Sequence, residues 1–423
     1  MIEEITLGAG VTLRCFRDDR FKQGCLSLQF VSPMNEATAA KNALLPSVLL
    51  RGTEKCPDIC SMTHRLDDLY GASVGPLVRR AGDWQTTGLF CGFIDDKYAL
   101  NGDAIFAPMV EFLKEILFLP RLEKGVFPEN VVEGEKKNLI ATIEARMNDK
   151  RTYAFDKLIS HMCKGDSFGI PRLGKKEDVQ AITAEGLYLH YENLLKTAPV
   201  ELFYVGSQAP EAVAEQLKQL FAHRPRGVEK LPVQTAFAGE KGGSFEEKME
   251  VSQGKLSMGF YTGITVGNPD YTAMQLLNII YGAGVTSKLF LNVREKLSLC
   301  YYCGSSENGQ KGFMTVHSGI EFKNEKKAAD EILAQLEEIK KGNISENEMR
   351  DAKLALIDSA ERIADSAGNM LNWYFACVMN GQMITPEEKC EKVLATMAED
   401  IVRVSQNIRL DTYYFLCAKE GNA

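Results

Sequence analysis

The sequence of 423 residues has little that favours a nucleic-acid partner or a membrane. Its 49 Lys and Arg residues are outnumbered by 57 Asp and Glu residues, which gives a formal net charge of -8. Phosphate-binding surfaces normally show the opposite excess, so we expect no nucleic-acid partner. The chain also lacks any run of about 18 uncharged apolar residues, the length that a membrane-spanning helix requires.

Two further absences concern the cell compartment. Residues 1–5 are acidic where a secretory signal would be basic, and no apolar segment follows them. The cysteines are 11, an odd number, and they are scattered from Cys15 to Cys417. Such usage fits reduced thiols better than a disulfide framework. The sequence therefore predicts a cytoplasmic protein.

Histidine is scarce, which bears on metal binding. The five histidines include no pair four residues apart; they are His64, His161, His190, His223 and His317. A catalytic zinc site uses three protein ligands, commonly with two histidines on one helix. We therefore expect this chain to hold no zinc and no other cofactor.

What the sequence does contain is a faint internal repeat. Residues 24–30 (GCLSLQF) match residues 254–260 (GKLSMGF) at five of seven positions, with Leu28 and Met258 taken as equivalent. Residues 127–130 and 344–347 each open a helix-like run, with Ser345 as an N-cap. The common order of these matches favours a duplicated unit.

The length and the repeat together predict two domains. A chain of 423 residues is too long for one ordinary core. A stretch rich in Pro and Gly, residues 223–245, predicts a linker between domains at 1–222 and 246–423. Strands and helices alternate irregularly in each half. We expect the α+β class, with helices packed on a mainly antiparallel sheet in each of two homologous domains.

A family resemblance enters at residues 35–57. They predict a helix capped by Asn35 and a turn, residues 51–57 (RGTEKCP). This end resembles the Lys-Gly-Thr-x-x-x-Pro stretch after the zinc helix of insulinase (pitrilysin-like) peptidases, the inverted zincins. Residues 66–72 (LDDLYGA) and 282–296 (GAGVTSKLFLNVREK), followed by Tyr301, are similar to further runs of that family. The resemblance covers most of the chain.

The resemblance implies a degenerate metal site. Active members carry H-x-x-E-H on this helix, and the positions that correspond to the two ligands and the base are Ala43, Ser47 and Pro46. Glu135 falls where the family places its third ligand. One carboxylate cannot hold zinc usefully, so a solvated helix carboxylate is the alternative interpretation of Glu135.

The second half keeps a candidate substrate site. Arg294 and Tyr301 have the spacing of an Arg and a Tyr that the family directs toward the substrate at the zinc centre, where both groups can stabilise an oxyanion. The alternative is that Arg294 pairs with Glu295 or Asp351 on the surface and that Tyr301 packs in a sheet. Gly282, Gly284 and Ser287 form a possible chamber loop, or only a turn before a helix.

Two cysteines in this region have a suggestive spacing, but the sequence does not favour a reactive or metal-binding pair. Cys300 and Cys303 have the spacing of a redox or metal pair. The flanking residues predict a strand, however, and residues three apart on a regular strand point to opposite faces. We therefore expect the two thiols not to meet.

The reading that fits these features is a non-catalytic subunit, a pseudoenzyme. The family's smaller bacterial members pair into two-subunit clamshells, and some pairs divide the site between a chain with H-x-x-E-H and a chain without it. The resemblance thus implies a peptide substrate, a heterodimer or a homodimer, and zinc only in the partner. The alternative is a structural or peptide-binding scaffold with no protease activity in its complex.

Overall fold

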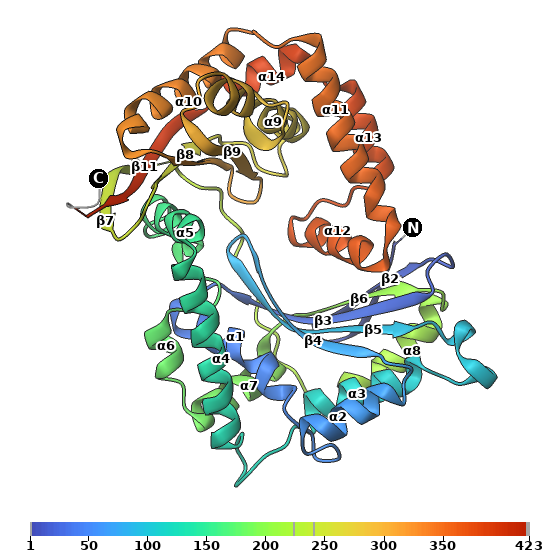
Figure 1. Cartoon of the computed structure of the whole chain (residues 1–423). Helices are drawn as coiled ribbons and strands as arrows, with labels where there is room; N and C mark the ends of the chain where they lie inside the picture. Colours follow the sequence, from blue (N-terminus) through green and yellow to red (C-terminus); the bar gives the residue numbers. More distant parts are fainter. Residues whose placement is uncertain (1, 223–224, 240–241, 420–423) are drawn as a thin grey trace. The chain divides into compact units, whose positions relative to one another are not determined.

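A computed structural model describes residues 2–222, 225–239 and 242–419 (Figure 1). The chain forms two compact units, each assembled from separate stretches. Unit 1 comprises Met1–Ile143, Ile170–Gln234 and Asp365–Ala376, and unit 2 comprises Glu144–Gly169, Thr235–Ala364 and Cys377–Ala423. The expected linker, 223–245, contains the passage between units at Gln234, and its residues 223–224 and 240–241 lie outside the described residues.

Unit 1 is built on a six-stranded sheet of order β1-β2-β6-β3-β5-β4. The pair β2 and β6 is parallel and every other pair is antiparallel. The strands are β1 (Ile2–Gly8), β2 (Val11–Arg17), β3 (Gln23–Pro33), β4 (Ser73–Ala81), β5 (Trp84–Ile94) and β6 (Val200–Gly206). The helices are α1 (Glu36–Leu49), α2 (Ile59–Asp67), α3 (Phe106–Phe118), α4 (Glu129–Asn148), α6 (Lys176–Gln180), α7 (Ala184–Thr197) and α8 (Pro210–Phe221). The end of α4, from residue 144, belongs to unit 2.

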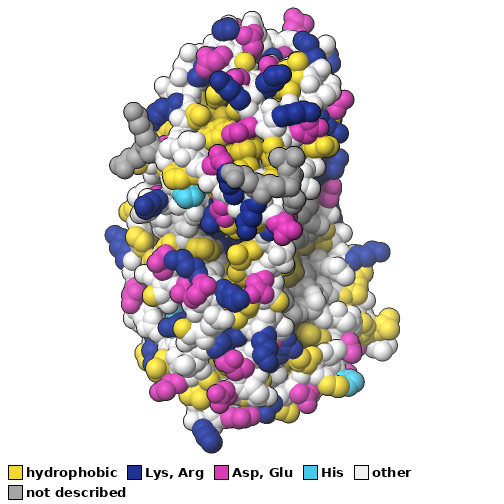
Figure 2. Space-filling view, turned by 60° about the vertical axis from the view of Figure 1, so that its left-hand side comes forward, with side chains coloured by type: hydrophobic (Ala, Val, Ile, Leu, Met, Phe, Trp, Pro, Cys, Tyr) yellow, Lys and Arg dark blue, Asp and Glu magenta, His cyan; other side chains and the backbone are white. Residues whose placement is uncertain are grey.

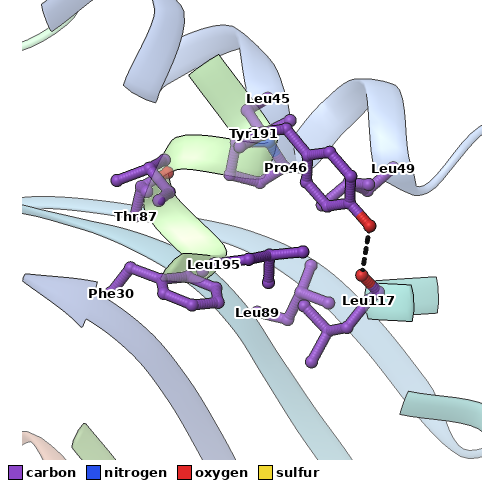
Figure 3. A pocket seen from close by; sticks show the side chains of 11 residues that line it. Phe30, Leu45, Pro46, Leu49, Thr87, Leu89, Leu117, Tyr191 and Leu195 are labelled. Carbon is purple, nitrogen blue, oxygen red and sulfur yellow. Dashed lines mark hydrogen bonds between the residues drawn. The ribbon is translucent and has the colours of Figure 1, made fainter. Parts of the chain in front are cut away.

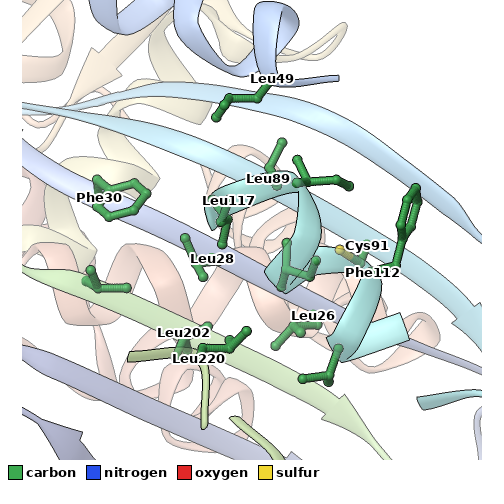
Figure 4. Close-up of a cluster of buried hydrophobic side chains, with 14 of the residues drawn as sticks. Leu26, Leu28, Phe30, Leu49, Leu89, Cys91, Phe112, Leu117, Leu202 and Leu220 are labelled. Atoms are coloured by element: carbon green, nitrogen blue, oxygen red, sulfur yellow. The ribbon is translucent and has the colours of Figure 1, made fainter. Parts of the chain in front are cut away.

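Alternation along the central strands positions the core of unit 1. Leu26 and Leu28 on β3 and Leu89 on β5 point to one face of the sheet, where they meet Phe112 and Leu117 of α3 (Figure 4). Burying a side chain of this size stabilises the fold by roughly 1.5–3 kcal/mol. Helix α1 packs against the same face, where its Leu44 and Leu45 belong to the same cluster.

Unit 2 is built on a five-stranded sheet of order β7-β11-β8-β10-β9. Here β7 and β11 are parallel and the other pairs are antiparallel. The strands are β7 (Gly243–Met249), β8 (Gly254–Tyr261), β9 (Cys300–Asn308), β10 (Phe313–Ile320) and β11 (Arg409–Ala418). The helices are α5 (Lys150–Met162), α9 (Tyr271–Asn278), α10 (Glu325–Lys340), α11 (Glu346–Glu361), α13 (Pro386–Ala395) and α14 (Ala398–Ser405), with π-helical segments η4 (Ile279–Ala283) and η5 (Leu289–Lys296).

The two sheets repeat one topology. Without β1, the order β2-β6-β3-β5-β4 corresponds strand by strand to β7-β11-β8-β10-β9, and the single parallel pair stands at the same end of each. The repeated sequence motifs fall on the corresponding central strands β3 and β8. Ser345 caps α11 through a capping box, as expected. The α+β class and the duplicated architecture are therefore confirmed.

The two halves of the sequence exchange one helix each. Helix α5, which follows α4, belongs to unit 2, where Tyr153 and Leu158 pack with Tyr414 of β11. Its counterpart after α11 is α12 (Ala367–Met379), most of which belongs to unit 1, where the Phe375 ring lies 5.8 Å from that of Phe203 on β6. Strands β11 and β6 correspond, so the exchange is reciprocal. Continuous domains at 1–222 and 246–423 do not describe these compact units.

The surface shows no stripe of one charge on the face drawn in Figure 2, where basic and acidic side chains are interspersed. Within the described residues, no helix is both long and apolar enough to cross a membrane.

Candidate functional site

Helix α1 carries the positions of the degenerate metal site. The Asn35 side chain caps it as expected, because its Oδ1 accepts a hydrogen bond of 2.8 Å from the amide of Ala37. The helix is continuous from Glu36 to Leu49 although Pro46 lies inside it. Proline offers no amide to the helix interior and ordinarily disrupts it, so packing of the buried Pro46 ring must offset that cost.

Of the three positions on α1 that the resemblance assigns to the metal site, two are buried and apolar. Ala43 and Pro46 are buried. The Pro46 ring lines a small cavity with Leu45, Leu89 and Tyr191 (Figure 3). The Tyr191 hydroxyl is turned to the carbonyl of Leu117, to which it donates a hydrogen bond of 2.7 Å. A cavity lined in this way offers neither metal donors nor the polar partners that an ordered water needs.

Glu135, which the resemblance places at the third metal ligand, is paired with a positive charge of the same chain. Its side chain is 8% exposed and forms an ion pair with the guanidinium of Arg51, which follows α1. The Asn138 amide donates a further hydrogen bond of 3.2 Å to the same carboxylate. Burying a carboxylate alone would be costly. Arg51 thus supplies the positive charge that a metal would supply, and Glu135 is not a freely solvated carboxylate.

A polar network beside the site engages the nearest histidine. His190 of α7 donates from Nε2 to Oδ1 of Asn42 on α1 at 2.7 Å, and the Asn42 amide donates to Gln85 on β5 at 2.8 Å. Burial, with a smaller effect of the Lys41 charge, lowers the pKa of His190 to about 4. The imidazole is therefore neutral near pH 7, and its contacts serve packing.

No set of residues in the described ranges fits a zinc ion. No group of three or more His, Cys, Asp or Glu side chains in them is arranged to hold a metal. This agrees with the chemistry of Ala43, Pro46 and Ser47, which offer a methyl group, a saturated ring and a neutral hydroxyl. A tetrahedral site needs several N, S or charged O ligands.

In unit 2, the segment from Gly282 to Ser287 is held by close contacts. A Cβ added at Gly282 would meet Oγ of Ser305 at 2.6 Å, so only glycine fits there, whereas Gly284 has open space around it. The side chain of the buried Ser287 accepts a hydrogen bond of 3.3 Å from the amide of Phe290. The next residue, Lys288, pairs with Glu348 at 2.8 Å.

Arg294 and Tyr301 are both accessible. The Arg294 side chain is 42% exposed; its Nε lies 3.4 Å from the Glu295 carboxylate, and its guanidinium lies 4.7 Å from the ring centre of Phe290. Tyr301 is 57% exposed, on the edge strand β9. The surface pair of Arg294 with Glu295 is thus present, while Tyr301 is not packed within the sheet. Within the part of the chain that the structure describes, neither side chain forms an ion pair with a buried residue.

The expectation that Cys300 and Cys303 point to opposite faces is wrong. In the register of β9 with β10, Cys300 lies opposite Ile320 and Tyr302 opposite the adjacent Gly319, so Tyr301 is an extra residue. Such a β-bulge interrupts the two-residue alternation. Both thiols consequently pack with the same hydrophobic cluster, and each shifts the pKa of the other.

Sequence reasoning missed Arg51 as the partner of Glu135 and His190 as the partner of Asn42. Each pair joins residues far apart in the chain, at separations of 84 and 148 residues. For the first pair, the sequence held one indication: Arg51 directly follows the predicted helix. Its positive charge must therefore lie near any carboxylate that faces the end of that helix. No local pattern points from His190 to Asn42.

Comparison with known proteins shows which sequences and structures this chain is similar to. Residues 181–356 match the family model described as "Peptidase M16 inactive domain". The chain is 32% identical over 414 residues to "Probable inactive metalloprotease YmfF" of Bacillus subtilis, which covers 97% of both proteins. A solved structure of a conserved protein from Enterococcus faecalis matches with a TM-score of 0.92, at 30% identity over 100% of both chains.

A second solved structure, of a peptidase M16 inactive domain from Pseudomonas fluorescens, matches with a TM-score of 0.82. Its identity is 17%, with 99% of this chain and 98% of that chain covered, so this likeness concerns the fold. Together with Ala43, Pro46 and Ser47 on α1, the full-length similarity to the Bacillus protein shows that this chain belongs to the peptidase M16 family as an inactive metalloprotease homologue.

Proposed function

We propose that this chain is a non-catalytic subunit that shapes a peptide chamber for a zinc-bearing M16 partner. In this proposal Arg294 and Tyr301 bind the substrate at the partner's zinc centre, and Gly282, Gly284 and Ser287 form a loop of the chamber. The partner is a chain of similar length that carries H-x-x-E-H. The two chains form a heterodimeric clamshell that acts in the cytoplasm.

One observation carries this proposal, namely the contrast between the two halves. In the first half, the positions that the resemblance assigns to the metal site hold two apolar groups and a neutral hydroxyl, and Glu135 is paired with Arg51. In the second half, Arg294 and Tyr301 remain exposed and have only weak surface contacts. A scaffold would have no need of an accessible guanidinium and phenol at the family's spacing.

The chemistry of the two side chains suits an oxyanion. The guanidinium can donate two parallel hydrogen bonds to a carbonyl or carboxylate, and the phenol can donate one more. Donors placed where negative charge develops lower the barrier most when the site excludes water. In this proposal, closure of the partner over the exposed pair provides that exclusion.

Other features agree with the assignment of compartment and assembly. All eleven cysteines are free thiols, which suits a reducing cytoplasm. A homodimer of this chain would offer no metal donors at either copy of α1. The heterodimer is therefore the assembly that yields peptidase activity, with zinc held by the partner alone.

The test is peptide cleavage by the reconstituted pair. We expect Arg294→Ala and Tyr301→Phe each to lower turnover by roughly 10²-fold, the scale of losing one oxyanion donor. Arg350→Ala is the matched control, because Arg350 is an exposed arginine that pairs with its neighbour Asp351. Gel filtration checks that each variant still assembles.

The alternative is a structural or peptide-binding scaffold with no protease activity in its complex. Unchanged cleavage by both variants at full assembly would exclude the substrate role and favour this scaffold. A pair that assembles but shows no cleavage even with the native chain would point the same way.

A further inference from the structure

The two cysteines that flank Tyr301 form an unassigned reactive pair. Cys303 is part of the buried cluster of unit 2, and Cys300 packs against the same cluster from a partly exposed position. On the opposite face of β9, Tyr302 contacts the guanidinium of Arg151, 4.5 Å from its ring centre. The bulge at Tyr301 is therefore what brings both sulfurs to one face.

We propose that Cys300 and Cys303 are a peroxide-reactive dithiol, in which Cys300 is oxidised first and Cys303 then closes an intrachain disulfide. The assignment rests on the register of β9, on the shared side of the two thiols and on their difference in exposure. An accessible thiol with a second thiol beside it is the arrangement of a redox-sensing cysteine.

The electrostatic surroundings give the two thiols different roles. A hydrogen bond from Cys303 lowers the pKa of Cys300, helped by the Ser318 hydroxyl and the Arg294 charge and opposed by burial. The same hydrogen bond, together with burial, raises the pKa of Cys303 well above its ordinary value. Cys300 is thus the nucleophile, because the thiolate is the reactive form, and Cys303 is the donor that resolves it.

The reaction balances with hydrogen peroxide as the only oxidant. The Cys300 thiolate attacks one peroxide oxygen, the O–O bond breaks, and the leaving hydroxide takes a proton to become water, which leaves a sulfenic acid. The Cys303 sulfur then attacks the Cys300 sulfur, the S–O bond breaks, and the Cys303 proton leaves with the hydroxyl as a second water. Two thiols are oxidised to a disulfide and one peroxide is reduced to two waters.

Closing this disulfide must move Tyr301. Residues three apart on a regular strand are separated by about 10 Å at roughly 3.4 Å per residue, whereas bridged cysteines need Cα atoms within about 7 Å. At the bulge, Cys300 and Cys303 lie opposite Ile320 and Ser318, which are two residues apart. Their backbones are therefore separated by about 7 Å, at the upper limit for a bridge, so closing the disulfide pulls on the residue between them. If Tyr301 binds substrate as proposed above, oxidation also regulates that site; the chemistry of the thiols does not depend on it.

The experiment treats the full chain with hydrogen peroxide, alkylates the remaining thiols and maps them by peptide mass spectrometry. We expect an intrachain link between Cys300 and Cys303 that dithiothreitol reverses. Before oxidation, Cys300 should alkylate at least about 10-fold faster than Cys390 at pH 7, because more of it is thiolate. Cys390 is a matched control, since it is also partly exposed and its pKa is raised by burial and by nearby glutamates.

Two variants separate the steps. Cys303→Ala should leave a sulfenic acid at Cys300 that dimedone traps, and Cys300→Ser should prevent the disulfide while Cys303 stays reduced. Alkylation of Cys300 no faster than Cys390, or oxidation that links only separate chains, would overturn the proposal. Because the readout is the covalent state of this chain alone, failure here is distinct from failure of the cleavage assay with a partner.

Discussion

The ion pair between Arg51 and Glu135 makes a quantitative prediction. Within the described residues, Arg51→Met leaves the Glu135 carboxylate, 8% exposed, with the Asn138 amide as its remaining side-chain donor. Removing one partner of a buried pair costs about 3–5 kcal/mol. Arg51 is itself 35% exposed, so water can replace part of its charge, and we expect a loss of about 2–3 kcal/mol in the free energy of unfolding.

The double variant tests the cause of that loss. Arg51→Met with Glu135→Gln removes both charges and leaves an amide that Asn138 can still contact, so most of the stability should return. The expected coupling between the two positions is about 1.5–2.5 kcal/mol. Arg121→Met is the control, because Arg121 forms a half-exposed pair with Glu123, and exposed pairs contribute at most about 1 kcal/mol.

The assay is equilibrium unfolding in urea, with hydrogen exchange of the α4 amides to localise the effect in unit 1. Exchange is needed because a chain with two compact units need not unfold in one step. A coupling below about 0.5 kcal/mol, the scale of additive sites, would refute the view that Arg51 takes the place of a metal charge.

Three further predictions follow from the same structure. The pKa of His190 is lowered to about 4 by burial, so the unfolded chain binds a proton at this residue at higher pH than the folded chain does. The free energy of unfolding should therefore be largest above about pH 6.5 and fall by up to about 3 kcal/mol toward pH 4. His190→Gln should flatten this profile in an acid titration. Dialysed protein should contain no stoichiometric zinc by elemental analysis, and zinc that survives dialysis would contradict the donor chemistry of α1. Phe375→Ala in α12 should destabilise unit 1 by about 3–5 kcal/mol, seen as faster amide exchange in β6 with unit 2 unaffected.

Local patterns in the sequence were sufficient for the repeat and the caps. The motifs at Gly24 and Gly254 lie on the corresponding strands β3 and β8, and Asn35 and Ser345 cap α1 and α11 as expected. Each of these features depends on residues within one or two turns of chain. Alternation and capping act at that range, so one sequence contains them.

The exchanged helices lay beyond such patterns. Nothing in residues 150–162 says which sheet will bury their apolar face, because an amphipathic helix fits either sheet of a duplicated fold. The structure shows α5 in unit 2 and most of α12 in unit 1. The linker rich in Pro and Gly indicates one place where the chain passes from one unit to the other. No such composition marks the other places where it does so.

The prediction that Cys300 and Cys303 point to opposite faces failed for a local reason, a β-bulge. One extra residue, Tyr301, changes which side chains share a face of β9, and composition alone does not announce a bulge. Bulges at sheet edges also disturb the row of free backbone groups that would otherwise pair with another strand, and β9 is an edge strand. The same residue thus protects the edge, projects the exposed phenol and brings the two thiols together. Deletion of Tyr301 would restore regular pairing with the register Cys300–Ile320, Tyr302–Gly319 and Cys303–Ser318. The two thiols would then be two residues apart and would still share one face, so the intrachain disulfide should still form while the exposed phenol is lost.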